Sequence, residues 1–454
     1  MPRRRGRNIS LSDLLSEAGM SAGELARNVN RLAAAEGMSL RYDRTAVAHW
    51  LAGSRPRGPV PELVAEVLTR RTGRAVSLAE TGLAKDANED TGDDVANGRQ
   101  ADPLRSLVAL ARIDADPARR STLLRSVFRE LALPDGGTVP TGQDAGRSGR
   151  RAGITDADAE RVRFMLDQFA ANWSRFGGGH ARALPASYLG DDIGRLLVRP
   201  AKPAARRDLL SATAQLAYLL GEMAADAGHP GLAQRYYYAA LRTAAEHGDH
   251  RIRAITLRAL SVQAVRMGAL RYAVDLADTA VTTAGTAASD DLQAFVLAQR
   301  AQVRALSGER HEAYRDLGMA DRILERAESC PGLFTCYPRA GWAYRKGQVL
   351  YRLGDTQAAL DSLRYAAQER PSHDRRRRAF SQARVALVLL DLGRVGEACV
   401  YTRHFVDECA SLRSHRSVLL LKELQGQLVR FRRVPEVVVL LNRMSHHAPT
   451  PGTS

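Results

Sequence analysis

The chain has 454 residues, of which 45% are hydrophobic, 26% charged and 6% aromatic, a composition that excludes a disordered or fibrous protein. Its formal net charge is +16, and only four of its basic residues are lysines. This arginine excess favours a polyanionic partner, but a genome rich in GC would produce the same bias, so the charge alone does not identify a partner.

The residue content favours helices throughout. Alanine and leucine are abundant and runs of β-branched residues are scarce, so we predict an all-α fold.

The four cysteines, Cys330, Cys336, Cys399 and Cys409, are too few for a disulfide scaffold and indicate a reducing cytosol. The spacing of Cys330 and Cys336 is wider than that of zinc ligands, so we expect no metal and no cofactor. The chain has no secretory signal and no run of ~18 apolar residues, so we expect a cytoplasmic protein without membrane contact.

Two helices are predicted at the N-terminus. Leu11, Leu14 and Leu15 follow helical spacing, and Gly19 ends that helix. Ser21 and Glu24 then have the spacing of a capping box, which begins the second helix.

The stretch "YDRTAVAHWLAGSRPRG" predicts a third helix that begins after Asp43 and ends at Gly53. Val47, Trp50 and Leu51 recur at helical spacing and are expected to face the core. The opposite face matches that of a recognition helix, and Arg55 and Arg57 follow it where a phosphate-contacting loop would lie. The residues predicted to contact DNA are Arg41, Arg44, Thr45, Ala48, His49, Arg55 and Arg57.

Pro59 and Pro61 open a fourth helix, which ends at "RRTG". The order of these elements resembles the repressor-like helix-turn-helix domains of bacterial regulators. The connection between the second and third helices is longer than the usual short turn, so "NRLAAAEGMSLRYD" must either extend the second helix or form a longer connection. A small helical domain with a solvated arginine face is the alternative. Arg3 to Arg7 would form either a groove-binding arm or a disordered tail.

The middle of the chain alternates polar linkers with helices. We predict a DNA-binding domain at 1–83, an acidic linker at 84–103, a short helical segment at 104–133, a flexible linker at 134–153, atypical helices at the solenoid entrance at 154–209, a tetratricopeptide-like repeat domain at 210–445 and a disordered tail at 446–454. Within the entrance helices, "RFGGGHARALPASYL" contains three glycines that could form a nest for an anion, or simply a loop.

A repeated pattern of small residues runs through the last half of the chain. Its five copies begin their second helices after Gly228, Gly268, Gly308, Gly354 and Gly393, and an alanine follows each glycine by five residues. This spacing is typical of tetratricopeptide repeats, which stack helical pairs into a solenoid. In register, the first helices would line a concave face with Gln215, Tyr218, Glu222, Arg258, Gln302, Tyr344, Gln348 and Tyr351. Such a face suits a peptide or protein segment, or else contacts only the chain's own helices.

Three stretches together, "YDRTAVAHWLAGSRPRG", "RFGGGHARALPASYL" and "GLAQRYYYAALRTAAEHGD", resemble a family of actinomycete regulators that join a helix-turn-helix to tetratricopeptide repeats. One branch of that family comprises negative regulators of sporulation and antibiotic production. The resemblance implies a transcriptional regulator of development or secondary metabolism.

We therefore expect a non-enzymatic, DNA-binding repressor that forms a homodimer, with repeats that bind an effector or partner. A tetratricopeptide interaction scaffold without sequence-specific DNA binding is the alternative. No phosphate-binding loop or serine-hydrolase elbow occurs in the sequence.

Overall fold

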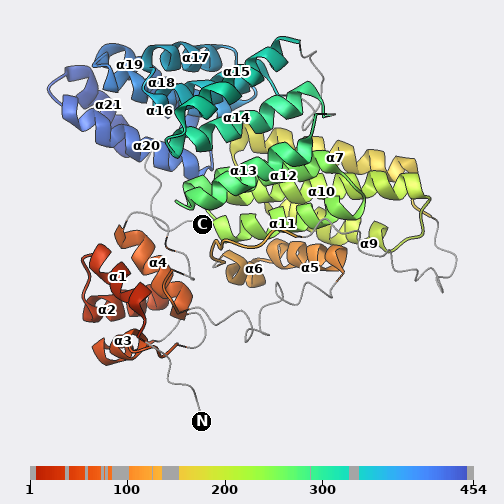
Figure 1. Ribbon diagram of the computed structural model, residues 1–454, viewed down its shortest axis with the longest axis horizontal. Coiled ribbons are helices and arrows are strands. Elements are labelled where there is room, and N and C mark those ends of the chain that lie inside the picture. The colour runs from red at the N-terminus through yellow and green to blue at the C-terminus, as the bar shows by residue number, and fades with distance from the viewer. Residues whose placement is uncertain are drawn as a thin grey trace.

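The computed structural model describes residues 7–35, 40–56, 60–72, 76, 80–83, 102–124, 126–134, 153–286, 288–326 and 337–446. Within these residues the chain is helical, apart from loops and one isolated parallel β-bridge between Ile154 and Ala201 (Figure 1). The prediction of an all-α fold is confirmed. None of the helices in this part of the chain has the length and apolar character needed to cross a membrane.

Four helices form the N-terminal domain: α1 (Ile9–Glu17), α2 (Ala22–Ala35), α3 (Arg44–Leu51) and α4 (Val60–Thr72). Their apolar faces meet in a separate core around Leu11, Leu25 and Trp50. The predicted capping box is present, because the Ser21 amide donates to the Glu24 carboxylate at 2.8 Å and the Glu24 amide donates to Ser21 Oγ at 3.3 Å.

The start and the end of this domain are joined by one side chain. Asn8 caps α1 by accepting a hydrogen bond from the Leu11 amide, and its amide group donates to the Thr81 carbonyl at 2.9 Å. The Asn8 main-chain amide also donates to the Leu51 carbonyl at the end of α3. Residues 80–83 are therefore part of the domain, with Leu83 buried in its core.

Five antiparallel helical pairs form the repeat domain. They are α10 (Pro203–Asp226) with α11 (Pro230–Glu246), α12 (His250–Arg266) with α13 (Leu270–Ala284), α14 (Asp290–Leu306) with α15 (Arg310–Arg326), α16 (Arg339–Leu353) with α17 (Thr356–Gln368), and α18 (Arg375–Asp391) with α19 (Val395–Cys409). Successive pairs stack on one another (Figure 1), as a solenoid of tetratricopeptide-like repeats requires. Two further helices, α20 (His415–Leu428) and α21 (Pro435–His446), follow the last pair.

Each repeat turns at the glycine that the sequence predicts. The glycines before α11, α13, α15, α17 and α19 all have positive φ, between +72° and +90°, which side chains other than glycine rarely adopt. The alanine five residues later is fully buried in every pair. Gly221 and Gly347 lie where two helices cross closely, since a Cβ atom at either position would lie 2.6 Å from the partner helix. Small residues at fixed spacing thus determine the pairing of the helices.

The helices α5 (Pro103–Ala115) and α6 (Pro117–Leu124) belong to the same core as the first two repeats. The sequence predicts them as a separate unit between two linkers, but their apolar residues pack against α11 and the helices before α10. The extended segment 126–134 continues along the repeats: Gln234 exchanges two hydrogen bonds with the Arg129 main chain, and Tyr238 and Tyr272 both donate to the Leu131 carbonyl at 2.8 Å.

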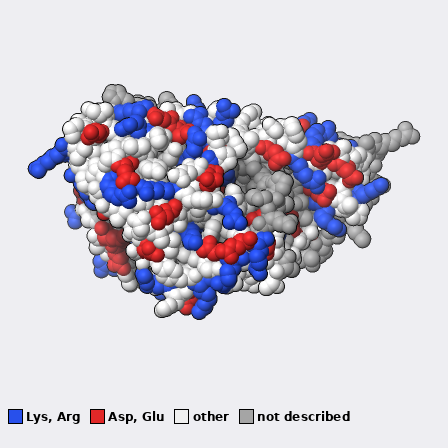
Figure 2. Space-filling model, turned by 90° about the horizontal axis from the view of Figure 1, so that it is seen from above, with Lys and Arg blue, Asp and Glu red and all other residues white. Residues whose placement is uncertain are grey.

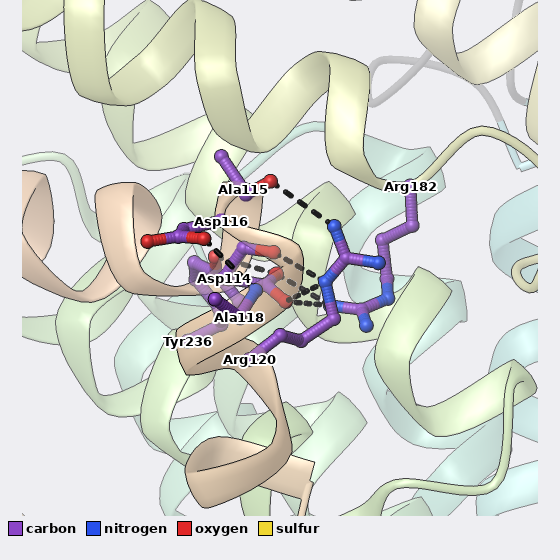
Figure 3. A network of polar contacts seen from close by, with 7 residues as sticks. All are labelled: Asp114, Ala115, Asp116, Ala118, Arg120, Arg182 and Tyr236. Atoms are coloured by element: carbon purple, nitrogen blue, oxygen red, sulfur yellow. Dashed lines mark hydrogen bonds and ion pairs between the residues drawn. The ribbon is translucent and has the colours of Figure 1, made fainter.

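A buried polar network fastens α5 to the repeats (Figure 3). The carboxylate of Asp114, at the end of α5, accepts hydrogen bonds from Arg182 and from the Tyr236 hydroxyl on α11. Arg120 of α6 lies beside Arg182 (Figure 3), donates to the Asp114 carbonyl at 2.6 Å and is 3.7 Å from the Asp114 carboxylate. Asp114 is fully buried and the Arg182 side chain is 8% exposed, so the pair is formed out of contact with water.

The predicted entrance helices are α7 (Asp156–Phe176), α8 (Ala183–Tyr188), a π-helical turn (Leu189–Ile193) and α9 (Gly194–Leu197). Helix α7 packs against both α10 and α18, which belong to the first and the fifth repeat. At the end of α7, the Phe176 carbonyl accepts a hydrogen bond from the Arg413 amide at 2.7 Å, just before α20. The Gly179 amide donates to the Arg413 carbonyl at 2.8 Å. The entrance and the exit of the solenoid are therefore in direct contact.

Candidate functional site

The predicted DNA-reading residues share the outer face of α3. Arg44, Thr45, Ala48 and His49 are exposed, whereas Val47 and Trp50 are buried on the opposite face. Arg41 is exposed just before the helix. Neither Arg41 nor Arg44 makes an ion pair or hydrogen bond within the part of the chain that the structure describes. Among the described residues, no side chain therefore neutralises their charges.

Three contacts fix the start of α3. The Asp43 carboxylate accepts a hydrogen bond from the Ala46 amide at 2.9 Å and so caps the helix. Asn30 of α2 donates to the Tyr42 carbonyl at 2.7 Å and accepts from the Tyr42 amide at 2.9 Å. The Tyr42 ring then packs edge-on against Trp50, with centroids 5.2 Å apart. The sequence analysis missed Asn30, because nothing local indicates that its side chain pairs with a residue twelve positions later.

The basic segments that flank α3 are only partly described. Arg55 is half-buried and interacts with another residue, and Arg57 lies outside the described residues. Of the N-terminal arginines, Arg7 is exposed and Arg3 to Arg5 also lie outside them. The connection 36–39 between α2 and α3 is likewise not described.

The predicted inner-face residues of the repeats do not line an open, unoccupied surface. Tyr218 is 5% exposed, and all the others except Tyr351 are half-buried. Their location on the first helix of each pair is as predicted, on α10, α12, α14 and α16. The helices α7 and α20 have side chains on the same interior, which the repeat pattern alone does not reveal.

Most of these inner-face residues also have partners within the chain, none of which is evident from the sequence. Glu222 accepts a hydrogen bond from the Tyr237 hydroxyl at 2.7 Å, and Gln215 donates to Ser211. Tyr344 accepts from Arg416 at 2.8 Å, and Gln348 lies 3.4 Å from the same hydroxyl. Tyr351 bonds to Asp391, and the Arg258 guanidinium stacks 4.1 Å above the Phe295 ring. Gln302 is half-buried on α14. Their use as a peptide or partner site stays a prediction.

One amide of the glycine run in "RFGGGHAR" binds an anionic group, and that group belongs to the chain. The Gly178 amide donates to the Asp226 carboxylate at 2.8 Å. A Cβ atom at Gly178 would lie 2.2 Å from the Met223 carbonyl, so only glycine fits against the end of α10. The same Asp226 carboxylate accepts from Ser414 at 2.8 Å and pairs with Arg376. This loop therefore closes the solenoid.

The basic run "HDRRRR" at the start of α18 pairs with groups inside the fold. Arg375 and Arg378 both pair with Glu408, and Arg377 pairs with Asp374. Arg376 is buried, with its guanidinium 4.0 Å above the Trp173 ring of α7. Long-range partners, which the sequence does not reveal, explain why these charges are not solvated.

The surface charge does not concentrate into one basic patch on the face shown in Figure 2, where arginine and lysine side chains alternate with carboxylates. No group of three or more metal-ligating side chains occurs within the described ranges. Cys399 and Cys409 are free thiols there, and Cys330 and Cys336 lie outside those ranges.

Comparison with known proteins yields two similarities. The family model described as the SP15 N-terminal domain matches residues 11–84, close to the limits of the α1–α4 domain. The crystal structure of the APC/C hetero-tetramer Cut9–Hcn1 contains a chain that is 14% identical, with 91% of this chain and 68% of that chain covered and a TM-score of 0.35. No curated protein matches. The assignment of helical repeats rests on the geometry of the chain itself.

Proposed function

We propose that the chain is a DNA-binding transcriptional regulator in which α3 reads base edges in the major groove. The observation that carries the proposal is the outer face of α3. Arg44 and His49 are exposed there on a helix whose start is held in place by Asn30 and Asp43. Arginine without an internal partner is suited to bidentate contact with guanine, and small residues such as Thr45 and Ala48 allow close approach to a base pair.

The repeat domain is a helical scaffold of the kind that supports protein–protein interaction. We propose that it also holds two copies of the chain together, since paired half-sites about one helical turn apart, ~34 Å, require two recognition helices. Exposed apolar side chains at its C-terminal end are available for such contact: Val438 and Val439 on α21, and Leu419 on α20. In this proposal an effector or partner changes the spacing of the two recognition helices.

The biological role follows from the resemblance to actinomycete regulators alone. On that basis we propose a cytoplasmic repressor of development or secondary metabolism, without an enzymatic activity.

The proposal is tested by measuring the affinity of the full chain for DNA recovered by selection from a random pool. Arg44→Ala or His49→Ala should each weaken binding to the selected sequence by ~1–3 kcal/mol, with a smaller effect on random DNA. Arg57→Ala should weaken both equally. Arg315→Ala, an exposed residue of α15, is the matched control and should bind like the parent. Equal affinity of all four variants and the parent would exclude α3 as the reading helix.

A scaffold without DNA binding is the second candidate, favoured by the extent of the repeat domain and its exposed apolar end. Salt separates the two functions. Binding of DNA through several arginines weakens steeply between 50 and 200 mM salt. A scaffold would show no saturable DNA binding even at the lower salt concentration.

A further inference from the structure

Guanidinium groups and aromatic rings alternate across the interior of the repeats. Arg258 of α12 stacks on Phe295 of α14, and Phe295 packs edge-on against Tyr337 with centroids 4.8 Å apart. Arg345 of α16 acts electrostatically on Tyr337 and on Tyr344. These contacts bring side chains from three successive repeats into one cluster.

The cluster continues to the C-terminal helices. Arg416 of α20 donates to the Tyr344 hydroxyl at 2.8 Å and stacks 4.4 Å above Phe380 of α18. Arg384, also on α18, pairs with Glu423 at 3.2 Å. We call Arg258, Arg345, Arg384 and Arg416 the interior arginines.

Negative charge in this cluster does not match the positive charge. Of the four interior arginines, Arg384 alone forms an ion pair with a described carboxylate. Asp226 acts on Arg416 from a distance, but it is already shared by Arg376, Ser414 and Gly178. Arg258 and Arg345 make no ion pair or hydrogen bond with any residue that the structure describes. Within the described residues, at least two guanidinium charges therefore have no carboxylate partner.

The imbalance is reflected in the protonation of the cluster. Burial, together with the charges of Arg258 and Arg416, lowers the pKa of Arg345 to about 9. Burial likewise lowers the pKa of Arg416 to about 10. Burial raises the pKa of Tyr344, but the charges of Arg416, Arg384 and Arg345 together bring it below its ordinary value. Arg345 and Arg416 are still charged at neutral pH, but burial and the neighbouring guanidinium charges destabilise both charges.

Several hydrogen-bond donors and acceptors in and beside the cluster also lack a partner among the described residues. The Nε atoms of Arg258 and Arg384 and the Oε1 atom of Gln348 are shielded from water and have no hydrogen-bond partner. Buried charges and polar groups without partners lower the stability of a fold, so an anion that supplied the missing acceptors would be bound favourably.

The geometry favours a small anion over a peptide chain. Helix α7 occupies the interior between α10 and α18, so an extended peptide could not run along the whole inner face without displacing it. The interior arginines themselves are half-buried and remain partly accessible. Several guanidinium groups converging from different helices suit the oxygens of a phosphate group, each of which can accept more than one hydrogen bond.

We infer that the interior arginines form a binding site for a small ligand that carries a phosphate group. Arg258 and Arg345 supply the charge that no carboxylate neutralises, Arg416 and Arg384 supply further donors, and the stacked rings of Phe295 and Phe380 hold two of the guanidinium planes in position. The site is independent of DNA binding by α3, so either proposal can fail without the other.

The test measures binding of sodium pyrophosphate and of inorganic phosphate to the full chain, by calorimetry and by thermal unfolding, with chloride adjusted to constant ionic strength. A saturable rise in the unfolding temperature of at least about 2 °C is expected for the parent. Arg345→Gln and Arg258→Gln should each weaken binding at least tenfold. Without ligand, Arg345→Gln should unfold at the same temperature as the parent or higher, because it removes an uncompensated charge.

Arg364→Gln is the matched control, since Arg364 pairs with Glu397 away from the cluster and should not alter binding. Absence of a saturable response in the parent would overturn the inference, as would an equal response in the parent and Arg345→Gln. Saturable binding of an oligoglutamate peptide without binding of pyrophosphate would also overturn it, in favour of a peptide site. The unfolding temperature without ligand shows whether each variant is folded. Arg258→Lys keeps the positive charge but loses the paired donors of the guanidinium group, so it should bind the ligand with intermediate affinity.

Discussion

Removal of the Asp114 carboxylate tests whether α5 and α6 are part of the repeat domain. In the parent, this fully buried group binds Arg182 and the Tyr236 hydroxyl (Figure 3). Asp114→Ala leaves the Arg182 guanidinium buried without its carboxylate, which costs about 3–5 kcal/mol in comparable pairs. Tyr236→Phe removes one hydrogen bond to a charged group, for which we expect about 1.5–3 kcal/mol.

The assay is urea unfolding followed by circular dichroism, with Asp192→Ala as the surface control. Asp192 pairs with Arg195 at 3.2 Å, but both side chains are mostly exposed, so the expected loss is about 0–1 kcal/mol. The double variant Asp114→Ala with Arg182→Met should be more stable than Asp114→Ala alone, because it no longer buries an unpaired charge. A double variant that is less stable than Asp114→Ala, or an Asp114→Ala loss no larger than the surface control, would refute the reasoning.

Three further outcomes follow from single contacts. Burial and the charge of Arg182 lower the pKa of His229 to about 4, below its unfolded value of ~6.5. The stability that His229 contributes is therefore complete above pH 6.5 and is lost as the pH falls toward 4. His229→Gln should remove about 2 kcal/mol of the acid destabilisation between pH 7 and 5, measured by urea unfolding, and an unchanged pH slope would contradict this. Gly231→Ala places a Cβ atom 1.9 Å from the Ser126 carbonyl oxygen, so the free energy of unfolding should fall by about 1–3 kcal/mol. Proteolysis within 126–134 should also become faster, and a digestion pattern like that of the parent would exclude the close approach. Asn30→Ala removes both hydrogen bonds to Tyr42 and should lower DNA affinity without touching DNA, whereas parent-like affinity would show that α3 is positioned by other contacts.

The repeats could be predicted because their determinants are local. A glycine with positive φ followed five residues later by a buried alanine is visible in the sequence of a single repeat. The same holds for the capping box at Ser21 and the N-cap at Asp43, whose partners lie three residues away.

The interior could not be predicted in the same way, because its contacts join distant parts of the chain. Asp226 bonds to Arg376 and Ser414, which follow it by 150 and 188 residues. The sequence around Arg376 is a run of like charges, and only the fold reveals that Trp173 and Glu408 lie against this run. The sequence pattern located these side chains on the first helix of each pair, where the structure has them, but it could not reveal that α7 and α20 also face this interior.

The measurement that tests the central claim most directly is genome-wide mapping of DNA bound by the chain in its native host, for the parent and for Arg44→Ala combined with His49→Ala. We predict discrete bound sites that share a common sequence arranged as two half-sites, and loss of these sites in the double variant. Enrichment of no sequence by the parent, or an unchanged set of sites in the double variant, would contradict DNA recognition by α3.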